Sequence, residues 1–257
     1  RAARDSLVRD STARVVMLRE ADSLHLRTRV AEWSLPDMRT TGGITLTSDG
    51  RLLVADGESG NVAQIDYRNG AVLKAFKLGR QTIHDDFVGI ATTGNGDVFE
   101  LTKTGTIYHF LEGSDGNRVE FLKHDTKLAG VCEFGGLAFS RERNALLLAC
   151  SVMKHRGDSL AFYWWALAAK DEDRLSSFRV ATTTHPAGVA IDPFGANYVL
   201  LSSTEAAAIT PAGRVVYSVT TPQGLEGVRG LAITRGGALL VAMNTSGGAK
   251  LARYAWR

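Results

Sequence analysis

Five segments of this chain repeat one pattern, in which a glycine and a short apolar stretch are followed by a polar turn and a run of Leu, Val and Ala. The glycines that open the repeats are 42 to 52 residues apart. A period near 40–50 residues that holds several short strands is typical of β-propellers. We therefore predict an all-β, five-bladed β-propeller with four antiparallel strands in each blade. The opening glycines are Gly43, Gly89, Gly136, Gly188 and Gly230.

The two ends of the repeat region complement each other. The fifth repeat stops after three strands, and the segment His25–Leu35, before the first repeat, has the pattern of one additional strand. An open ring of blades would leave two exposed sheet edges, so we expect His25–Leu35 to pair with Lys250–Ala255 and complete the last blade. We thus predict one propeller over residues 25–257, with residues 1–24 as an N-terminal arm or tether.

The strand that opens each repeat is predicted to lie innermost. Five strands crowd around a narrow axis there, and residues with little or no side chain permit this approach. The repeat glycines are therefore interpreted as structural. Tight hairpins connect the following strands, and in the second repeat we place the fourth strand at Arg118–Lys123.

Composition and charge exclude several classes of protein. The apolar share of 44% is ordinary for a globular chain, and no stretch of 18 apolar residues is present. The formal net charge is only +3, and no basic block is interleaved with aromatic residues. We therefore expect neither a transmembrane span nor a nucleic-acid partner.

The two cysteines, Cys132 and Cys150, are too few for a disulfide scaffold. They could form one bridge, which needs Cα atoms within about 7 Å of each other, or remain two buried thiols. In a regular hairpin Gly135 faces Cys150, and Cys132 then lies three residues out of register. A bridge requires a bend at Glu133, and the frequent burial of free cysteine favours thiols.

The first repeat, Gly43 to Asp56, has the sequence GITLTSDGRLLVAD and resembles NHL-type propeller repeats. The stretches DFVGIA at 86–91 and EFGGLA at 133–138 are similar to repeats of the bacterial SdiA-regulated five-bladed propellers. The resemblance covers about residues 38–257. It implies a periplasmic or secreted protein. Such a protein could also be a processed lipoprotein, with a membrane tether before residue 1.

The chain departs from that family pattern at its acidic positions. The Glu that precedes the repeat glycine in the family is Val88, Gly135 and Arg229 here, and Asn244 stands where an acid often closes the second strand of the last repeat. If those acids bind a cation in the family, this chain has lost most of the site. No cofactor is therefore expected, and a divalent cation such as calcium is the alternative.

Loops that lead into the inner strands gather around the axis at one mouth of a propeller, which is the default ligand position of the fold. We expect this mouth to be the only wide concavity, because the close inner strands leave a narrow axis. A ring of ion pairs, with Arg229 opposite Glu133 or Asp86, is the structural alternative to a binding site. The candidate ligand-binding residues are His84, Asp86, Glu133, His185 and Arg229.

Two kinds of chemistry fit this mouth. Asp56, Asp86 and Glu133 come from three successive blades and could supply the carboxylate pair of a glycosidase, although Asp56 also suits the capping of its own turn. His84 and His185 could join Asp86 and Glu133 around a divalent cation, but no close-spaced motif supports this. No catalytic residue is assigned. We therefore expect a non-catalytic binding or scaffolding protein, with a hydrolase, metal-assisted or glycosidase-like, as the alternative.

Blade three has the most distinctive surface for a partner. Its third strand holds the run Phe162-Tyr163-Trp164-Trp165, whose side chains alternate between two faces. Packing against both neighbouring blades is the simplest interpretation, whereas exposure of one pair would create a docking surface. Insertions at 151–158 and 168–174 flank this strand, so blade three is the expected contact with another protein.

Overall fold

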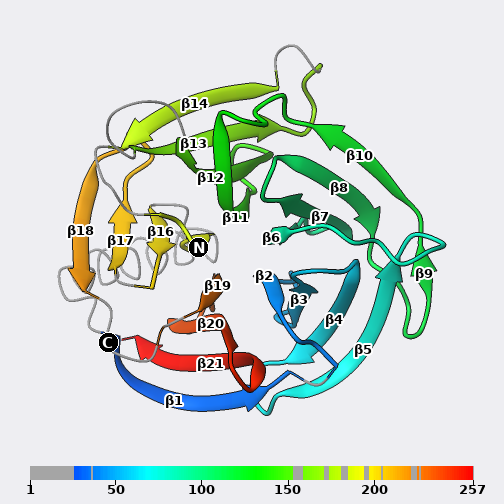
Figure 1. Ribbon diagram of the computed structural model, residues 1–257. Helices are drawn as coiled ribbons and strands as arrows, with labels where there is room; N and C mark the ends of the chain where they lie inside the picture. Colours follow the sequence, from blue (N-terminus) through cyan, green and yellow to red (C-terminus); the bar gives the residue numbers. More distant parts are fainter. Residues whose placement is uncertain are drawn as a thin grey trace, which may run out of the picture.

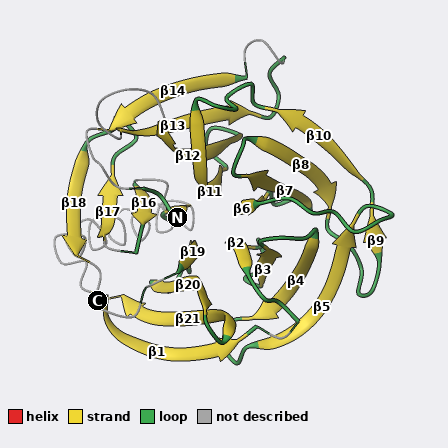
Figure 2. Ribbon diagram, viewed as in Figure 1, coloured by secondary structure: helices red, strands yellow, loops and turns green. Residues whose placement is uncertain are grey.

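The described part of the protein consists of 21 strands arranged as five blades around a central axis, in a computed structural model (Figure 1). The structure describes residues 26–35, 37–152, 159–170, 174–180, 185–193, 197–203, 205–220, 225 and 227–256. These residues form strands, turns and bends (Figure 2), and among them there is no helix long and apolar enough to cross a membrane. The predicted five-bladed β-propeller is confirmed.

The innermost strand of each blade carries one of the repeat glycines. These strands neighbour one another around the axis in chain order, and the fifth lies beside the first. The inner strands are β2 (Thr41–Leu46), β6 (Phe87–Thr92), β11 (Cys132–Ser140), β15 (Gly188–Ile191) and β19 (Val228–Ile233).

Each blade continues outward from its inner strand by antiparallel pairing. The second strands are β3 (Leu52–Asp56), β7 (Asp97–Thr102), β12 (Ala145–Val152), β16 (Tyr198–Leu201) and β20 (Ala238–Thr245). The third strands are β4 (Asn61–Asp66), β8 (Thr106–Leu111), β13 (Ser159–Ala166), β17 (Glu205–Ile209) and β21 (Gly248–Trp256). The outer strands are β5 (Ala71–Leu78), β10 (Phe121–Asp125), β14 (Leu175–Val180), β18 (Val215–Thr220) and β1 (Leu26–Ser34).

β1 completes the last blade. It pairs antiparallel with β21, the final strand, from Ser34 opposite Lys250 to Leu26 opposite Trp256 (bottom of Figure 1). The predicted closure of the ring is thus confirmed over the described strand. The predicted arm, residues 1–24, lies outside the described residues.

The outer edge of blade two differs from the prediction. The segment predicted as one strand is divided: β9 (Arg118–Val119) pairs in parallel with β5 of blade one, and only β10 pairs with β8. The loop before β9 is drawn to blade one because the Ala75 amide donates to the Asp115 carboxylate over 2.8 Å. The amide of Gly116 donates in turn to the Ala75 carbonyl over 2.7 Å. This loop therefore ties the first two blades together.

Apolar side chains fill the interfaces between blades, and the aromatic run of β13 contributes to two of them. Phe162 and Trp164 face Tyr198 of blade four, with ring centroids 6.1 and 5.5 Å away. Trp165 points the other way and lies 6.3 Å from the ring of Phe99 in blade two. Packing against both neighbouring blades is therefore the role of this run. Residues 153–158 and 171–173 of the flanking insertions lie outside the described residues.

Candidate functional site

Glycines line the narrowest part of the axis. An ideal Cβ on Gly43 would lie 2.9 Å from the Gly89 Cα, and one on Gly188 would lie 3.1 Å from the backbone of Gly230. Side chains do not fit such an approach, which confirms the structural interpretation of the repeat glycines. Residues that precede the glycines line one cavity, and residues that follow them line another. We call these the loop-side cavity and the turn-side cavity.

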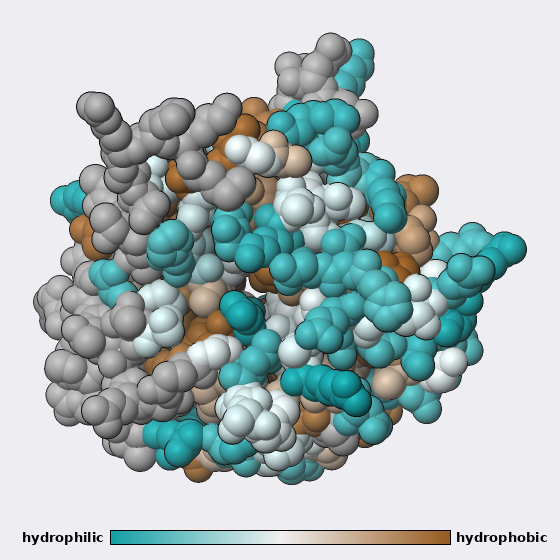
Figure 3. All heavy atoms as spheres, in the orientation of Figure 1, coloured by the Kyte–Doolittle hydropathy of each residue, from teal (hydrophilic) through white to brown (hydrophobic). Residues whose placement is uncertain are grey.

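The loop-side cavity is the predicted mouth. It measures about 190 Å³ and is bordered by all five blades, through the loops before the inner strands and those between second and third strands. The space-filling view shows a narrow central opening surrounded by hydrophilic residues (Figure 3). The charged residues that line this cavity are Glu58, Asp86, Lys103, Glu133 and Arg229.

Glu133 is paired with Lys103, not with Arg229. The Lys103 Nζ lies 2.9 Å from the Glu133 Oε1. The hydrogen bond and charge of Glu133 raise the pKa of Lys103, Asp86 adds to this, and the positive charge of Arg229 opposes it. The side chains of Lys103 and Glu133 are 43% and 49% exposed, so water screens the pair and it contributes at most about 1 kcal/mol.

Arg229 and Asp86 remain available for a ligand at this mouth. Neither side chain makes an ion pair or hydrogen bond with another residue that the structure describes. Both charges act on the pKa of Lys103, which Asp86 raises and Arg229 lowers, so both lie near the Lys103 ammonium group. Among the described residues, the loop-side cavity therefore offers the cation of Arg229 and the carboxylates of Asp86 and Glu58 beside the paired Lys103 and Glu133.

The two predicted histidines do not line the loop-side cavity. The backbone of His84 bridges to Ser59 of blade one. The His185 Nδ1 is hydrogen-bonded to the Ser151 hydroxyl at 2.8 Å. Within the described ranges, no three His, Cys, Asp or Glu residues come together in a way that could hold a metal ion.

Two further polar side chains near this cavity have structural partners. The Asp56 carboxylate accepts hydrogen bonds from the amides of Glu58 and Ser59 at 2.9 and 3.0 Å, so it caps its own loop. The Asn244 amide oxygen accepts bonds from the Thr41 amide at 2.7 Å and from the Thr41 hydroxyl at 3.2 Å. Asn244 thus joins blade five to blade one.

The two cysteines form a disulfide, so the expectation of free thiols was wrong. A bulge between Phe134 and Gly136 sets Phe134 opposite Cys150 and Cys132 opposite Val152. It shortens the offset between the cysteines from three residues to two, which places both side chains on one face of the sheet. Their Cα atoms are 5.6 Å apart, and both side chains are buried among apolar residues between blades two and three.

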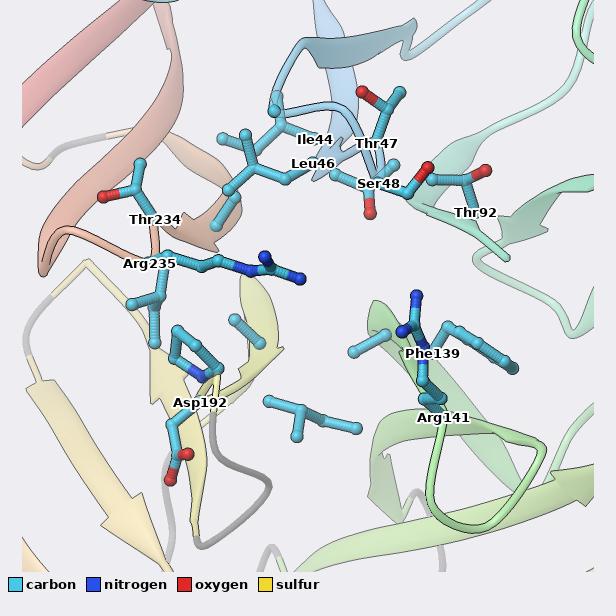
Figure 4. A pocket seen from close by; sticks show the side chains of 18 of the residues that line it. Ile44, Leu46, Thr47, Ser48, Thr92, Phe139, Arg141, Asp192, Thr234 and Arg235 are labelled. Carbon is cyan, nitrogen blue, oxygen red and sulfur yellow. The ribbon is translucent and has the colours of Figure 1, made fainter. Parts of the chain in front are cut away.

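The wider cavity lies at the other end of the axis, contrary to the expectation that the loop mouth would be the only wide concavity. This turn-side cavity measures about 750 Å³. It is formed by the turns between first and second strands and by the inner strands that lead to them (Figure 4). Long side chains occupy few of the positions facing it, which leaves it open.

The fold defines this protein as a five-bladed β-propeller. No family model matches the chain, and no curated protein matches it. Among solved structures it is similar to glutaminyl cyclase from Myxococcus xanthus, with a TM-score of 0.56 and 14% identity over 88% of this chain and 94% of that one.

Two further solved structures align with lower scores. Virginiamycin B lyase from Staphylococcus aureus has a TM-score of 0.49 and 12% identity, over 86% of this chain and 67% of that one. A protein of unknown function from Bacteroides caccae has a TM-score of 0.45 and 17% identity over 75% of this chain, which covers 65% of that protein. At 14% identity the similarity to glutaminyl cyclase shows the fold alone.

Proposed function

We propose that this protein is an extracytoplasmic propeller that binds or scaffolds another molecule, principally a protein, without catalysing a reaction on it. The observation that carries the proposal is the pairing of Glu133 with Lys103 at the loop-side cavity. A glycosidase needs two carboxylates with separate acid and base roles. Here Glu133 is paired with Lys103 and Asp56 caps its own loop. Of the three acids that the sequence offered for a glycosidase pair, Asp86 alone is left, with Glu58 as the other carboxylate that lines the cavity.

The disulfide supports the extracytoplasmic part of the proposal. Disulfides persist in oxidising compartments and are rare where thiols are kept reduced. Cys132 and Cys150 are bridged inside an apolar cluster. The proposal includes kinship with NHL-type propellers, which is supported by the repeat pattern of blade one and by the contacts among the inner-strand glycines.

For the partner we propose a protein that contacts blade three and the polar loop-side mouth. Asp86 and Arg229 supply opposite charges there. Such charges would orient a polar partner, and they would add less to the affinity of binding. The insertions at 151–158 and 168–174 flank the buried strand β13 and are the second candidate contact.

The test compares binding and hydrolysis in the same variants. Glu133→Ala and Arg229→Ala are assayed for retention of whatever protein copurifies from the native cells. Glu120→Ala is the matched control, because Glu120 is also paired with an arginine, Arg80, but its side chain is 85% exposed. We expect the first two variants to lose partner and the control to retain it.

The alternative is a hydrolase, metal-assisted or glycosidase-like, at the same mouth. It is tested with chromogenic glycosides and esters, on the wild-type protein and on Asp86→Asn. Turnover by the wild type that disappears in Asp86→Asn would contradict the proposal. Equal, background-level rates in both proteins would support it.

A further inference from the structure

The turn-side cavity has the size and composition of a small-molecule site. Its volume of about 750 Å³ falls within the range of about 300–1,000 Å³ that is usual for ligand pockets. The inner strands line it with aliphatic residues just beyond the repeat glycines, of which Leu46 and Ile191 are half-buried and the others are buried. These wall residues are Ile44, Leu46, Leu137, Val189, Ile191, Leu231 and Ile233.

Two arginines enter this cavity from different blades. Arg141 of blade three and Arg235 of blade five extend toward the middle of the cavity from opposite sides (Figure 4). Both occupy the fifth position after their repeat glycine. The equivalent residues of the other blades, Ser48, Gly94 and Pro193, are short. The arginines are thus the two long side chains in an otherwise small set, and the space between them stays open.

Nothing in the described part of the chain neutralises these two guanidinium groups. Neither Arg141 nor Arg235 forms an ion pair or a side-chain hydrogen bond with a described residue. The Arg141 guanidinium lies beside the turn of blade two, since a Cβ added to Gly94 would be 3.2 Å from the Arg141 Nη2. The wall therefore carries two unmatched positive charges.

Two of the three carboxylates that border the cavity are engaged elsewhere. Asp49 is held by Arg51 and by the Thr47 hydroxyl, and these contacts lower its pKa to about 2. Asp192 accepts a hydrogen bond from the Asn197 amide, and its carboxylate points away from the cavity (Figure 4). Glu142 forms no ion pair with a described residue, and its single charge offsets at most one of the two arginines. The cavity centre is consequently positive.

We propose that the turn-side cavity binds a small amphipathic organic anion, with its carboxylate or phosphate group between Arg141 and Arg235. Guanidinium groups are suited to both acids, because their planar donors match two oxygens at once. The apolar part of the anion lies against the inner-strand wall, which contributes by removing apolar surface from water. This site is at the opposite end of the axis from the loop-side cavity, so it does not depend on the binding role proposed there.

The test uses four probes with defined chemistry. Octanoate and octyl phosphate carry the two acid groups on the same apolar chain, octanol lacks the charge, and inorganic phosphate lacks the chain. Their dissociation constants are measured by isothermal titration calorimetry, up to millimolar probe and at low salt. The proteins are the wild type, Arg141→Gln, Arg235→Gln and the matched control Arg39→Gln, which removes an exposed arginine beside the loop-side cavity.

We expect the wild type to bind octanoate or octyl phosphate at least about tenfold more tightly than octanol. Each of Arg141→Gln and Arg235→Gln should weaken that binding about tenfold, the effect of losing one charge-assisted contact. Arg39→Gln should change it less than twofold. Whichever of the two anions binds more tightly identifies the acid group of the ligand.

Several results would overturn the proposal. These are equal binding of octanol, equal binding of inorganic phosphate, no binding of any probe, or weakening by Arg39→Gln as large as that by the cavity variants. Should either cavity variant fail to fold, salt dependence in the wild type decides. Sodium chloride must weaken octanoate and octyl phosphate but leave octanol unchanged, and a response shared by all three probes contradicts the site.

Discussion

Gly230 of the last blade lies so close to Gly43 of the first that an ideal Cβ on Gly230 would stand 2.9 Å from the Gly43 Cα. The backbone nitrogen of Ile44 would be 2.8 Å from the same Cβ. This contact closes the ring of blades at the axis, as the pairing of β1 with β21 closes it at the rim. The ring is thus closed in two places. At the axis the last blade contacts the first, and at the rim β1 completes the last blade itself.

The first prediction concerns the contact at the axis. Gly230→Ala forces the last blade away from the first and should lower the free energy of unfolding by about 1–3 kcal/mol, the usual cost of overpacking. Urea denaturation measures it. Gly247→Ala is the control, because the nearest atom to its added Cβ is the Thr245 hydroxyl at 3.8 Å; a change within about 0.5 kcal/mol is expected there. Equal effects of the two substitutions would refute the close approach.

The second prediction concerns the closure at the rim. Deletion of residues 25–36 exposes the edge of β21 and removes the ion pair of Glu32 with Lys250, whose atoms are 2.8 Å apart. It also removes Trp33, which packs against Gly70 of blade one. We expect loss of the single cooperative unfolding transition, followed by circular dichroism and by tryptophan fluorescence. Melting that is unchanged from the full chain would show that the ring does not need this strand.

The sequence was informative about the fold because its signals were local. Each repeat glycine begins an apolar stretch and precedes a polar turn, so the inner strand and first hairpin can be recognised within about fifteen residues. The place of Arg118–Val119 depends instead on a distant contact, between Ala75 and Asp115. No periodicity within the second repeat signals that contact, and these two residues were therefore included in the fourth strand of blade two.

The candidate site was predictable only in part. Asp86, Glu133 and Arg229 line the loop-side cavity because each lies one to three residues before a repeat glycine, at the same end of the axis. Which residue pairs with Glu133 depends on the reach of the Lys103 side chain from a neighbouring loop, and strand order does not contain that information. The signal for the turn-side cavity was present, since Arg141 and its counterpart in repeat five occupy equivalent positions.

The third prediction concerns the disulfide. Cys132 and Cys150 are 18 residues apart in sequence, and a loop of this length corresponds to about 3 kcal/mol of stabilisation in the chain-entropy account. The double variant Cys132→Ala/Cys150→Ala should therefore melt at a lower temperature than the oxidised wild type. Dithiothreitol should lower the melting temperature of the wild type but leave the variant unchanged. As a further check, the wild type is denatured, reduced and refolded without its bridge. If this protein melts at the same temperature as the oxidised wild type, the prediction is contradicted.

The last prediction concerns Glu100, a fully buried carboxyl in β7 between blades one and two. Neither of its oxygens has a hydrogen-bond partner among the described residues. Burial raises the pKa of Glu100 well above its ordinary value, and the nearby charge of Asp56 adds to this. In the folded protein the group therefore keeps its proton at a pH where the unfolded chain has released it.

The sign of the pH dependence follows from that proton. Below the ordinary pKa of about 4.3, Glu100 is protonated in both states and has no effect on the pH slope. As the pH rises above that value, the unfolded chain ionises and the folded protein does not, so the folded state loses stability by up to about 1.4 kcal/mol for each pH unit. This loss continues until the pH reaches the raised pKa.

Glu100→Gln removes the titration while keeping the shape of the side chain. Relative to the wild type, the variant should gain stability as the pH rises above about 4, up to the raised pKa of Glu100, because only the wild type bears the cost of keeping Glu100 protonated. Urea denaturation at a series of pH values measures the difference. Glu120→Gln serves as the control, since its exposed carboxyl should leave the two stability curves parallel. Parallel curves for Glu100→Gln as well would mean that Glu100 ionises normally in the folded protein.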